Sequence, residues 1–225
     1  MISNVTQNLF GLLVFLATIV ITKTEGRTLD VLNDKLSSSE YDTQERPNAG
    51  GPPVNVSVEL YITSIHSISE ISMDYGATMY LMMRWFDPRI SFESPDPIDL
   101  RSGSKLQKLI WTPDLYFVNV KQAELHQVTE TNKQIRIFPD GHVTSDIRVT
   151  LVLICHMHLH RFPMDKQLCH IEMESFSYSI KDVHLKWLTV NGSDSHAVSL
   201  PSHDSLPGFI LERPNMTVET PLYPM

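Results

Sequence analysis

Cysteine and histidine crowd one short stretch of this sequence, CHMHLHRFPMDKQLCH at residues 155–170. Both residue types bind zinc, and three histidines with an open fourth position make a common catalytic zinc site. In an extended strand, His156, His158 and His160 would project from the same side, about 7 Å apart along the chain. Such a face would make the protein a zinc-binding enzyme on a β-sandwich.

The cysteines have a second use if the chain is exported, as its N-terminal residues lead us to expect. Residues 9–21 read LFGLLVFLATIVI, an apolar run too short for a bilayer span and typical of a signal peptide within residues 1–26. In an oxidising compartment Cys155 and Cys169 form a disulfide by default, which removes them as zinc ligands. No HExxH or CxxC spacing is present, so the metal site is the weaker alternative and no cofactor is expected.

Composition narrows the class of protein further. The 225 residues suit one sizeable domain, and a net charge of −8 argues against a nucleic-acid partner, since phosphate binding requires a basic surface. No apolar stretch after residue 26 is long enough for a membrane helix. Three Asn-x-Ser/Thr sequons, at Asn55, Asn191 and Asn215, fit a glycosylated extracellular surface.

An alternation of apolar and polar residues dominates the chain after residue 53. Every second residue from Val54 to Ile62 is apolar, which predicts a half-buried strand. In residues 73–85, Tyr80, Met82 and Arg84 share one side of a predicted strand. The opposite, apolar side holds Met73, Tyr75, Ala77, Met79, Leu81, Met83 and Trp85.

Two further strands are predicted beside the cysteines. A turn signal, Pro139-Asp140-Gly141, precedes a strand that alternates from Val143 and ends on Cys155. Another strand is predicted to begin at Cys169.

A short helix and a turn-rich lead-in are predicted ahead of the strands, in residues 27–53. Leu29, Leu32 and Leu36 fall on one helical face there. One short helix followed by many closely spaced strands predicts a mainly β fold, an antiparallel sandwich.

The spacing within the cysteine stretch resembles a known signature. Cys155, Phe162, Pro163, Asp165 and Cys169 stand where the Cys-loop ligand-gated ion channels carry theirs. The resemblance runs from about residue 28 to residue 211. The motifs of this region, including WTPDLYF and MESFSYSIKDVHLKW, are most similar to those of glycine, type-A GABA and glutamate-gated chloride receptors. It implies an immunoglobulin-like sandwich, a disulfide-closed loop that couples to the pore, and a cis peptide bond before the loop proline.

The resemblance places half of a transmitter site on the principal face of the domain. Tyr116 and Phe176 would offer aromatic rings to a ligand ammonium, and Glu174 would offer its carboxylate. Trp111 and Asp114 are interpreted as structural.

The complementary face is implied at Tyr80, Met82 and Arg136, and here the sequence departs from the family. Met82 stands where glycine and many GABA subunits carry an arginine that binds the ligand carboxylate. Asp146, on the neighbouring strand, would repel that carboxylate, while Arg84 lies on the same side as Met82. The sequence therefore predicts a complementary face that is silent for amino-acid transmitters.

The resemblance also implies partners and a place in the cell. Such a subunit binds glycine, GABA, glutamate or a similar small molecule, and joins a homo- or hetero-pentamer on the extracellular side of the plasma membrane. The predicted organisation is a signal peptide at 1–26, a helix and lead-in at 27–53, a partial ligand-binding domain at 54–211 and a divergent tail at 212–225.

The sequence after residue 211 departs from the family and leaves several interpretations open. The family continues into a capping hairpin and membrane helices, where this sequence reads ERPNMTVETPLYPM. A fragment or incomplete gene prediction of a full subunit is favoured. The alternatives are a secreted truncated isoform that modulates receptor assembly, a soluble transmitter-binding protein and, last, the zinc-binding enzyme.

Overall fold

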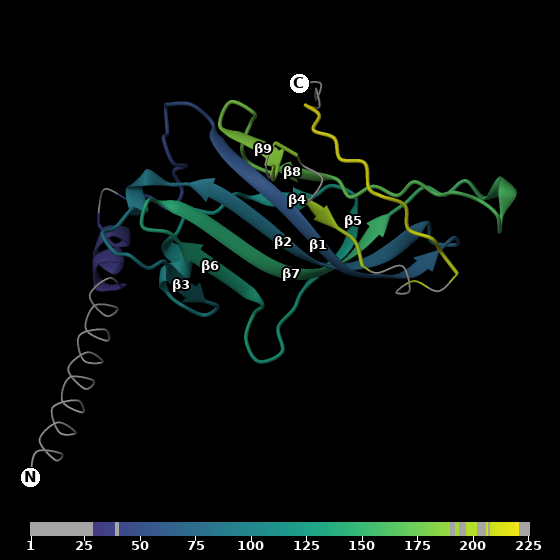
Figure 1. Ribbon diagram of the computed structural model, residues 1–225, viewed down its shortest axis with the longest axis horizontal. Coiled ribbons are helices and arrows are strands. Elements are labelled where there is room, and N and C mark those ends of the chain that lie inside the picture. The colour runs from purple at the N-terminus through teal and green to yellow at the C-terminus, as the bar shows by residue number, and fades with distance from the viewer. Residues whose placement is uncertain are drawn as a thin grey trace, which may run out of the picture.

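The computed structural model describes residues 29–38, 41–189, 192–193, 197–201, 206 and 208–220. The predicted signal peptide at 1–26 and the sequon asparagine Asn191 lie outside the described residues. Within them the chain is mainly β, as predicted, with a short helix at 29–36 (Figure 1). The strands are β1 Val54–Ser69, β2 Asp74–Phe86, β3 Ile98–Arg101, β4 Leu115–Phe117, β5 Val120–Leu125, β6 Lys133–Ile137, β7 His142–Ile154, β8 Met173–Ser175, β9 Val183–Trp187 and β10 Val198–Ser199.

The strands form one large sheet and one small ribbon. The large sheet runs β10-β1-β2-β7-β6-β3, with β5 also paired to β7 and β9 to β1, while β4 and β8 form a separate two-stranded sheet. Figure 1 shows β1, β2 and β7 as the long central strands, with β3 and β6 at one side and β4, β8 and β9 at the other. Most pairs are antiparallel, as predicted, but β9 and β10 run parallel to β1. Parallel pairing requires a crossover, and the connection from β1 to both strands passes through the rest of the fold.

Alternation along β2 decides which face of the sheet becomes the core. Tyr80, Met82 and Arg84 are accessible on one side, as the sequence predicts. On the other side Trp85 contacts the ring of Trp111 edge to face, 6.1 Å between centroids, and this contact joins β2 to the segment before β4. The buried residues of β2 on this side are Tyr75, Ala77, Met79, Leu81, Met83 and Trp85.

The predicted turn between β6 and β7 is confirmed. Gly141 has a φ of 94°, a left-handed conformation that glycine adopts without steric cost. Its N–H donates to the carbonyl of Phe138 at 3.0 Å, and a Cβ at this position would lie 2.7 Å from the Asp87 carbonyl oxygen. Both the conformation and the space therefore require glycine.

Two arginines fix the lead-in that precedes β1. Arg46 is buried and donates to the carbonyl oxygens of four residues between 47 and 52, as well as to Asp182. Arg89 forms a bidentate pair with the fully buried Asp87 and also donates to the carbonyl oxygens of Asp42 and Glu45. The lead-in is thus held by charge-assisted hydrogen bonds, which are stronger than neutral ones.

The helix at 29–36 follows its predicted pattern only in part. Leu32 and Leu36 are buried, whereas Leu29 is 41% exposed. Leu29 is the first helical residue, one turn before the point where the helix meets the core.

The strands beside the cysteines are shorter than predicted. β7 ends at Ile154 rather than Cys155, and β8 begins at Met173 rather than Cys169. The segment between them leaves the sheet as a loop that contains a 3-10 turn, η3 Leu159–Arg161. The apolar alternation of Met157 and Leu159 imitates a strand, and both side chains pack at the core, but neither residue belongs to a strand and Leu159 begins η3.

Candidate ligand-binding site

The β4–β8 ribbon brings together the three residues predicted for the principal face. Tyr116 is the register partner of Glu174, and its hydroxyl donates to Glu174 Oε2 at 3.3 Å. Its ring meets that of Phe176 edge to face, 5.7 Å between centroids and at 85°. Partial desolvation, followed by the Glu174 carboxylate, raises the pKa of Tyr116, so the hydroxyl stays a donor at neutral pH. We call these three residues the aromatic corner.

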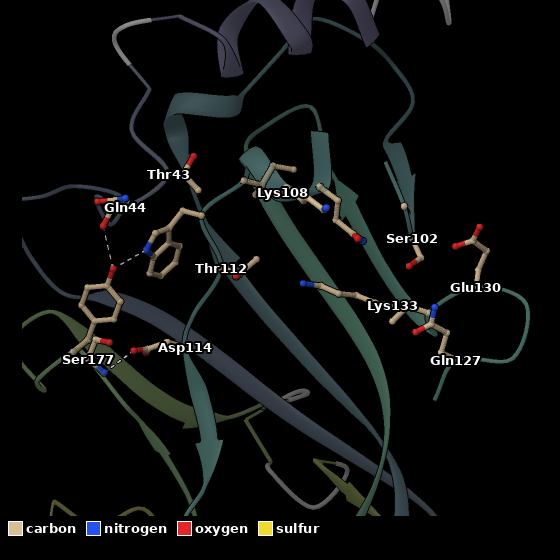
Figure 2. Close-up of a pocket in the computed structure, with 16 residues that line it drawn as sticks. Thr43, Gln44, Ser102, Lys108, Thr112, Asp114, Gln127, Glu130, Lys133 and Ser177 are labelled. Atoms are coloured by element: carbon tan, nitrogen blue, oxygen red, sulfur yellow. Dashed lines mark hydrogen bonds between the residues drawn. The ribbon is translucent and has the colours of Figure 1, made fainter. Parts of the chain in front are cut away.

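The aromatic corner is held in place by Asp114. Its carboxylate accepts hydrogen bonds from Ser175 Oγ and from the backbone N–H of Ser177, both at 2.5 Å, and its carbonyl accepts from the N–H of Phe176 at 3.2 Å. Burial acts to raise the pKa of Asp114, but the hydrogen bonds from the two serines outweigh it and hold the pKa below its usual value. The ionised Asp114 therefore acts as a clasp: its hydrogen bonds hold the first residues of the loop after β8 against the segment that precedes β4 (Figure 2).

The aromatic corner has the chemistry to receive an organic ammonium. Phe176 is 80% exposed, so its ring face is available, and Glu174 supplies negative charge beside it. A cation over an aromatic face gains roughly 0.5–1 kcal/mol at an exposed site and about 2 when desolvated. Because Phe176 is exposed, the interaction reaches about 2 kcal/mol only if another segment or subunit covers the ring and excludes water.

The exposed side of the large sheet carries the residues predicted for the complementary face. Pairing register places Glu59, Met82, Asp146 and Gln134 in one row across β1, β2, β7 and β6. In the adjoining rows, Arg84 and Tyr80 flank Met82 on the same side of β2.

Arg84 and Arg136, the two arginines that the sequence analysis named on this face, are both paired with an acid. Arg136 donates to both carboxylate oxygens of Asp99, at 2.5 and 2.9 Å, and Arg84 donates to Glu59 at 3.0 Å. Burial raises the pKa of Asp146, against the opposing influence of Arg84 and Arg136. Arg84 lies on the same side of β2 as Met82, where the family carries its arginine, but its guanidinium is paired with Glu59.

Tyr80 sits in an aromatic and cationic setting of its own. Its ring centroid lies 6.2 Å from that of Tyr61 on β1, and the guanidinium carbon of Arg148 on β7 lies 5.9 Å from it. The structure therefore gathers the predicted residues into two separate sets. Tyr80, Met82 and Arg136 lie on the large sheet, and the aromatic corner lies on the ribbon.

The cysteine stretch is a closed loop. Cys155 and Cys169 form a disulfide with a Cα–Cα distance of 5.1 Å, and the Phe162–Pro163 bond is cis, as predicted. Inside the loop Gln167 bonds to both backbone groups of His158 and to the side chain of Asp165.

The histidines of the loop do not form the face that the zinc alternative requires. All three side chains are exposed, and His160 lies within η3, so the three histidines do not share one extended strand. Among the described residues no group of three or more His, Cys, Asp or Glu side chains is placed to hold a metal ion.

Two of the predicted sequons are accessible to glycosylation. Asn55 points outward from β1, and Asn215 lies exposed in the tail. The tail itself runs beside β9, where Trp187 Nε1 donates to the carbonyl of Thr217 at 3.1 Å.

Comparison with known proteins identifies the family. Residues 29–220 match the family described as the neurotransmitter-gated ion-channel ligand binding domain. The chain belongs to this family. It is also 44% identical over 149 residues to the gamma-aminobutyric acid receptor subunit theta of Mus musculus, a match that covers 66% of this chain and 23% of that relative.

Membership settles the class of protein. This is a receptor domain and not an enzyme, which removes the zinc-enzyme alternative. The matched region spans less than a quarter of the mouse subunit's length. No helix within the described part of the chain is long and apolar enough to cross a bilayer.

Proposed function

We propose that this chain is the extracellular transmitter-binding domain of a chloride-channel subunit, and that it contributes the principal half of the site. The observation that carries the proposal is the aromatic corner, where the rings of Tyr116 and Phe176 meet beside the carboxylate of Glu174. The mouse relative is named as a GABA receptor subunit, which favours an amino acid with a terminal ammonium as the ligand.

The complementary half of the site comes from a different subunit. A transmitter carboxylate placed over this chain's large sheet would meet Met82 where a cation is needed, with Asp146 directly opposite across the strands. The guanidinium groups of Arg84 and Arg136 are neutralised by Glu59 and Asp99. Like charge and the absence of an available fork therefore disfavour an amino-acid ligand on this face. We expect a hetero-pentamer in the plasma membrane, with this domain outside the cell.

The cysteine loop supplies the link to a pore domain. The loop, which is fixed by the disulfide and by Gln167, exposes Phe162 and Met164 near its middle and Leu168 next to Cys169. Exposed apolar side chains on a braced loop are suited to contact another apolar surface. Phe162, Pro163 and Asp165 are the residues we assign to coupling.

A test of the proposal uses an ammonium probe without a carboxylate. The chain, produced by secretion, is titrated with butylammonium and, as a neutral control, with 1-butanol, and the ring signals of Tyr116 and Phe176 are followed by NMR. We expect saturable shifts with butylammonium alone, in the millimolar range because half a site is present.

Two variants locate that binding. Phe176→Ala and Glu174→Gln should each weaken butylammonium binding, whereas Phe209→Ala, at an exposed phenylalanine shortly before the tail, should not. Equal shifts with the amine and the alcohol, or full binding by both corner variants, would refute the principal-face assignment.

A further inference from the structure

The sequon asparagine of β1 lies between two neighbouring strands on the accessible side of the large sheet. Asn55 is exposed, and on one side it is the register partner of His184 on β9. On its other side, the antiparallel register of β1 with β2 continues to Phe86, the last residue of β2. Phe86 is exposed as well, so the two side chains project next to each other from the same face. Opposite residues of an antiparallel pair have Cβ atoms about 4.5–5.5 Å apart.

Phe86 and His142 together form a small aromatic surface, which we call the Phe86 platform. The two residues are register partners on β2 and β7, and their ring centroids lie 5.0 Å apart at an angle of 51°. The Phe86 ring also lies close to the turn before β7, where its Cε2 atom would be 3.4 Å from a Cβ at Gly141. These contacts hold the ring from the β7 side, yet 41% of Phe86 stays exposed. An oriented apolar surface therefore lies next to Asn55.

Asp140 orients the imidazole of the platform. Its Oδ2 lies 2.8 Å from His142 Nδ1, and its Oδ1 accepts the backbone N–H of His142 at 3.0 Å. The backbone hydrogen bond, with help from the imidazole, outweighs desolvation and holds the pKa of Asp140 below its usual value. A neutral imidazole whose Nδ1–H faces a carboxylate presents its Nε2 as a hydrogen-bond acceptor. The platform thus combines an apolar ring with a polar acceptor.

A sugar ring has the chemistry that matches this combination. N-linked glycans begin with N-acetylglucosamine, which is joined to the asparagine of the sequon. One face of this sugar carries C–H bonds with slight positive charge, which pack against the negative face of an aromatic ring. Its hydroxyl groups can donate to an imidazole nitrogen. We infer that the first sugars of a glycan on Asn55 lie against Phe86 and donate a hydrogen bond to His142.

Covalent attachment makes such a weak contact effective. A sugar joined to Asn55 stays within reach of Phe86, and a short tether gives an effective concentration in the millimolar range. The attached sugar also loses less translational freedom than a free saccharide would on binding. The inference goes beyond the proposed function, because neither the aromatic corner nor the cysteine loop takes part in it.

A glycan held on the platform would mark one end of the accessible sheet face. Asn55 and Glu59 lie on the same side of β1, and four residues of strand correspond to about 13 Å. Glu59 belongs to the row that contains Met82. Under the proposed function, a neighbouring subunit that covers the row of Met82 would therefore have to leave the Phe86 platform open.

The decisive experiment looks for the contact between sugar and ring. The chain is secreted from cells as a ¹³C-labelled glycoprotein in which Asn191→Gln and Asn215→Gln leave Asn55 as the remaining predicted sequon. We expect nuclear Overhauser contacts between the ring protons of Phe86 and the C–H protons of the first two sugars, with upfield shifts of those sugar protons. An Asn55 without a glycan, or a glycan that contacts only His184 or no ring at all, would overturn the inference.

Melting temperatures provide a second readout in a double-mutant cycle. In the single-glycan protein, Asn55→Gln should lower the melting temperature by about 2–4 °C, the shift expected when a chain of this size loses a contact as strong as an aromatic pair. Phe86→Leu keeps an apolar side chain but removes the aromatic face, so in this background Asn55→Gln should change the melting temperature by less than about 1 °C. Equal shifts in the two backgrounds would contradict the contact.

Two further variants separate the platform from general effects of glycosylation. Phe86→Trp keeps an aromatic face and should preserve the dependence of melting temperature on the glycan. Phe209→Ala removes a phenylalanine of similar exposure, 47%, elsewhere in the chain, and should preserve it too. Loss of the dependence in Phe209→Ala would show that the glycan stabilises the fold without the Phe86 platform.

Discussion

Replacement of Asp114 should loosen the loop that carries the aromatic ring of the site. The carboxylate accepts two hydrogen bonds, each at 2.5 Å, from Ser175 Oγ and the Ser177 N–H. Hydrogen bonds to charged groups are worth about 1.5–3 kcal/mol each. Because the side chain is half-buried and water can replace part of the loss, we take the lower value for both. Asp114→Ala should therefore cost about 3 kcal/mol of unfolding free energy.

Asp114→Asn is the informative companion. It preserves shape and can still accept from Ser177, while the Ser175 hydroxyl can rotate to accept from the new amide. The cost should fall to about 1–2 kcal/mol, the difference between a charged and a neutral acceptor. A double-mutant cycle with Ser175→Ala should give a coupling energy near 1.5 kcal/mol.

The pH dependence follows from the lowered pKa of Asp114. A carboxyl group whose folded-state pKa is depressed contributes stability above its unfolded pKa and loses it as the pH falls through the folded value. The gap in unfolding free energy between wild type and Asp114→Ala should thus be constant near neutrality and shrink as the pH drops below about 4.

Urea unfolding followed by tryptophan fluorescence measures these differences, since Trp111 donates to Tyr178 within the same region. An Asp114→Ala variant as stable as the wild type, or a stability gap that persists unchanged in acid, would show that the clasp does not hold the loop.

Further predictions concern the loop, the core, the sheet face and the surface. Cys155→Ala with Cys169→Ala removes a ring of separation 14 and should cost about 3 kcal/mol in urea unfolding, an effect that reduction of the wild type should reproduce. Met79→Ala, at a fully buried position, should cost about 2–5 kcal/mol, and a smaller loss would mean that the core relaxes around it. Met82→Arg should lower the raised pKa of Asp146, observed by carboxyl NMR, and stabilise the fold by up to about 1 kcal/mol at neutral pH but less below pH 4, where the carboxyl is protonated. Asn55→Gln should reduce the mass of the secreted protein by one glycan, and no change would mean that this sequon is unused.

The alternation of apolar and polar residues predicted the long strands of the large sheet well, because it depends only on which face of each strand is buried. Residues 79–85 separate into a buried side and an accessible side as expected, whereas Gly76 and Thr78, on the side of Tyr80, are buried as well. The same rule failed next to the cysteines. There Met157 and Leu159 continue the apolar period, while the disulfide and the turn at Pro163 draw the chain out of the sheet. Periodicity carries no information about such a covalent constraint.

Contacts between distant segments were harder to predict. The meeting of Tyr116 with Phe176 depends on the register of β4 against β8, which only the family resemblance indicated. The parallel strands β9 and β10 were not predicted, because their pairing partner lies far away in the chain.

The paired arginines of the large sheet have a consequence for the order of subunits around a ring. In a cyclic assembly every interface joins the principal face of one subunit to the complementary face of the next, so the contacts are head to tail. Under the proposed function, a subunit whose complementary face holds Arg84 on Glu59 and Arg136 on Asp99 would complete no transmitter site with a copy of itself. The number of sites that these subunits contribute through their principal faces would then equal the number of them that are followed by a different subunit. Subunit order alone would thus set how many transmitter molecules the receptor counts.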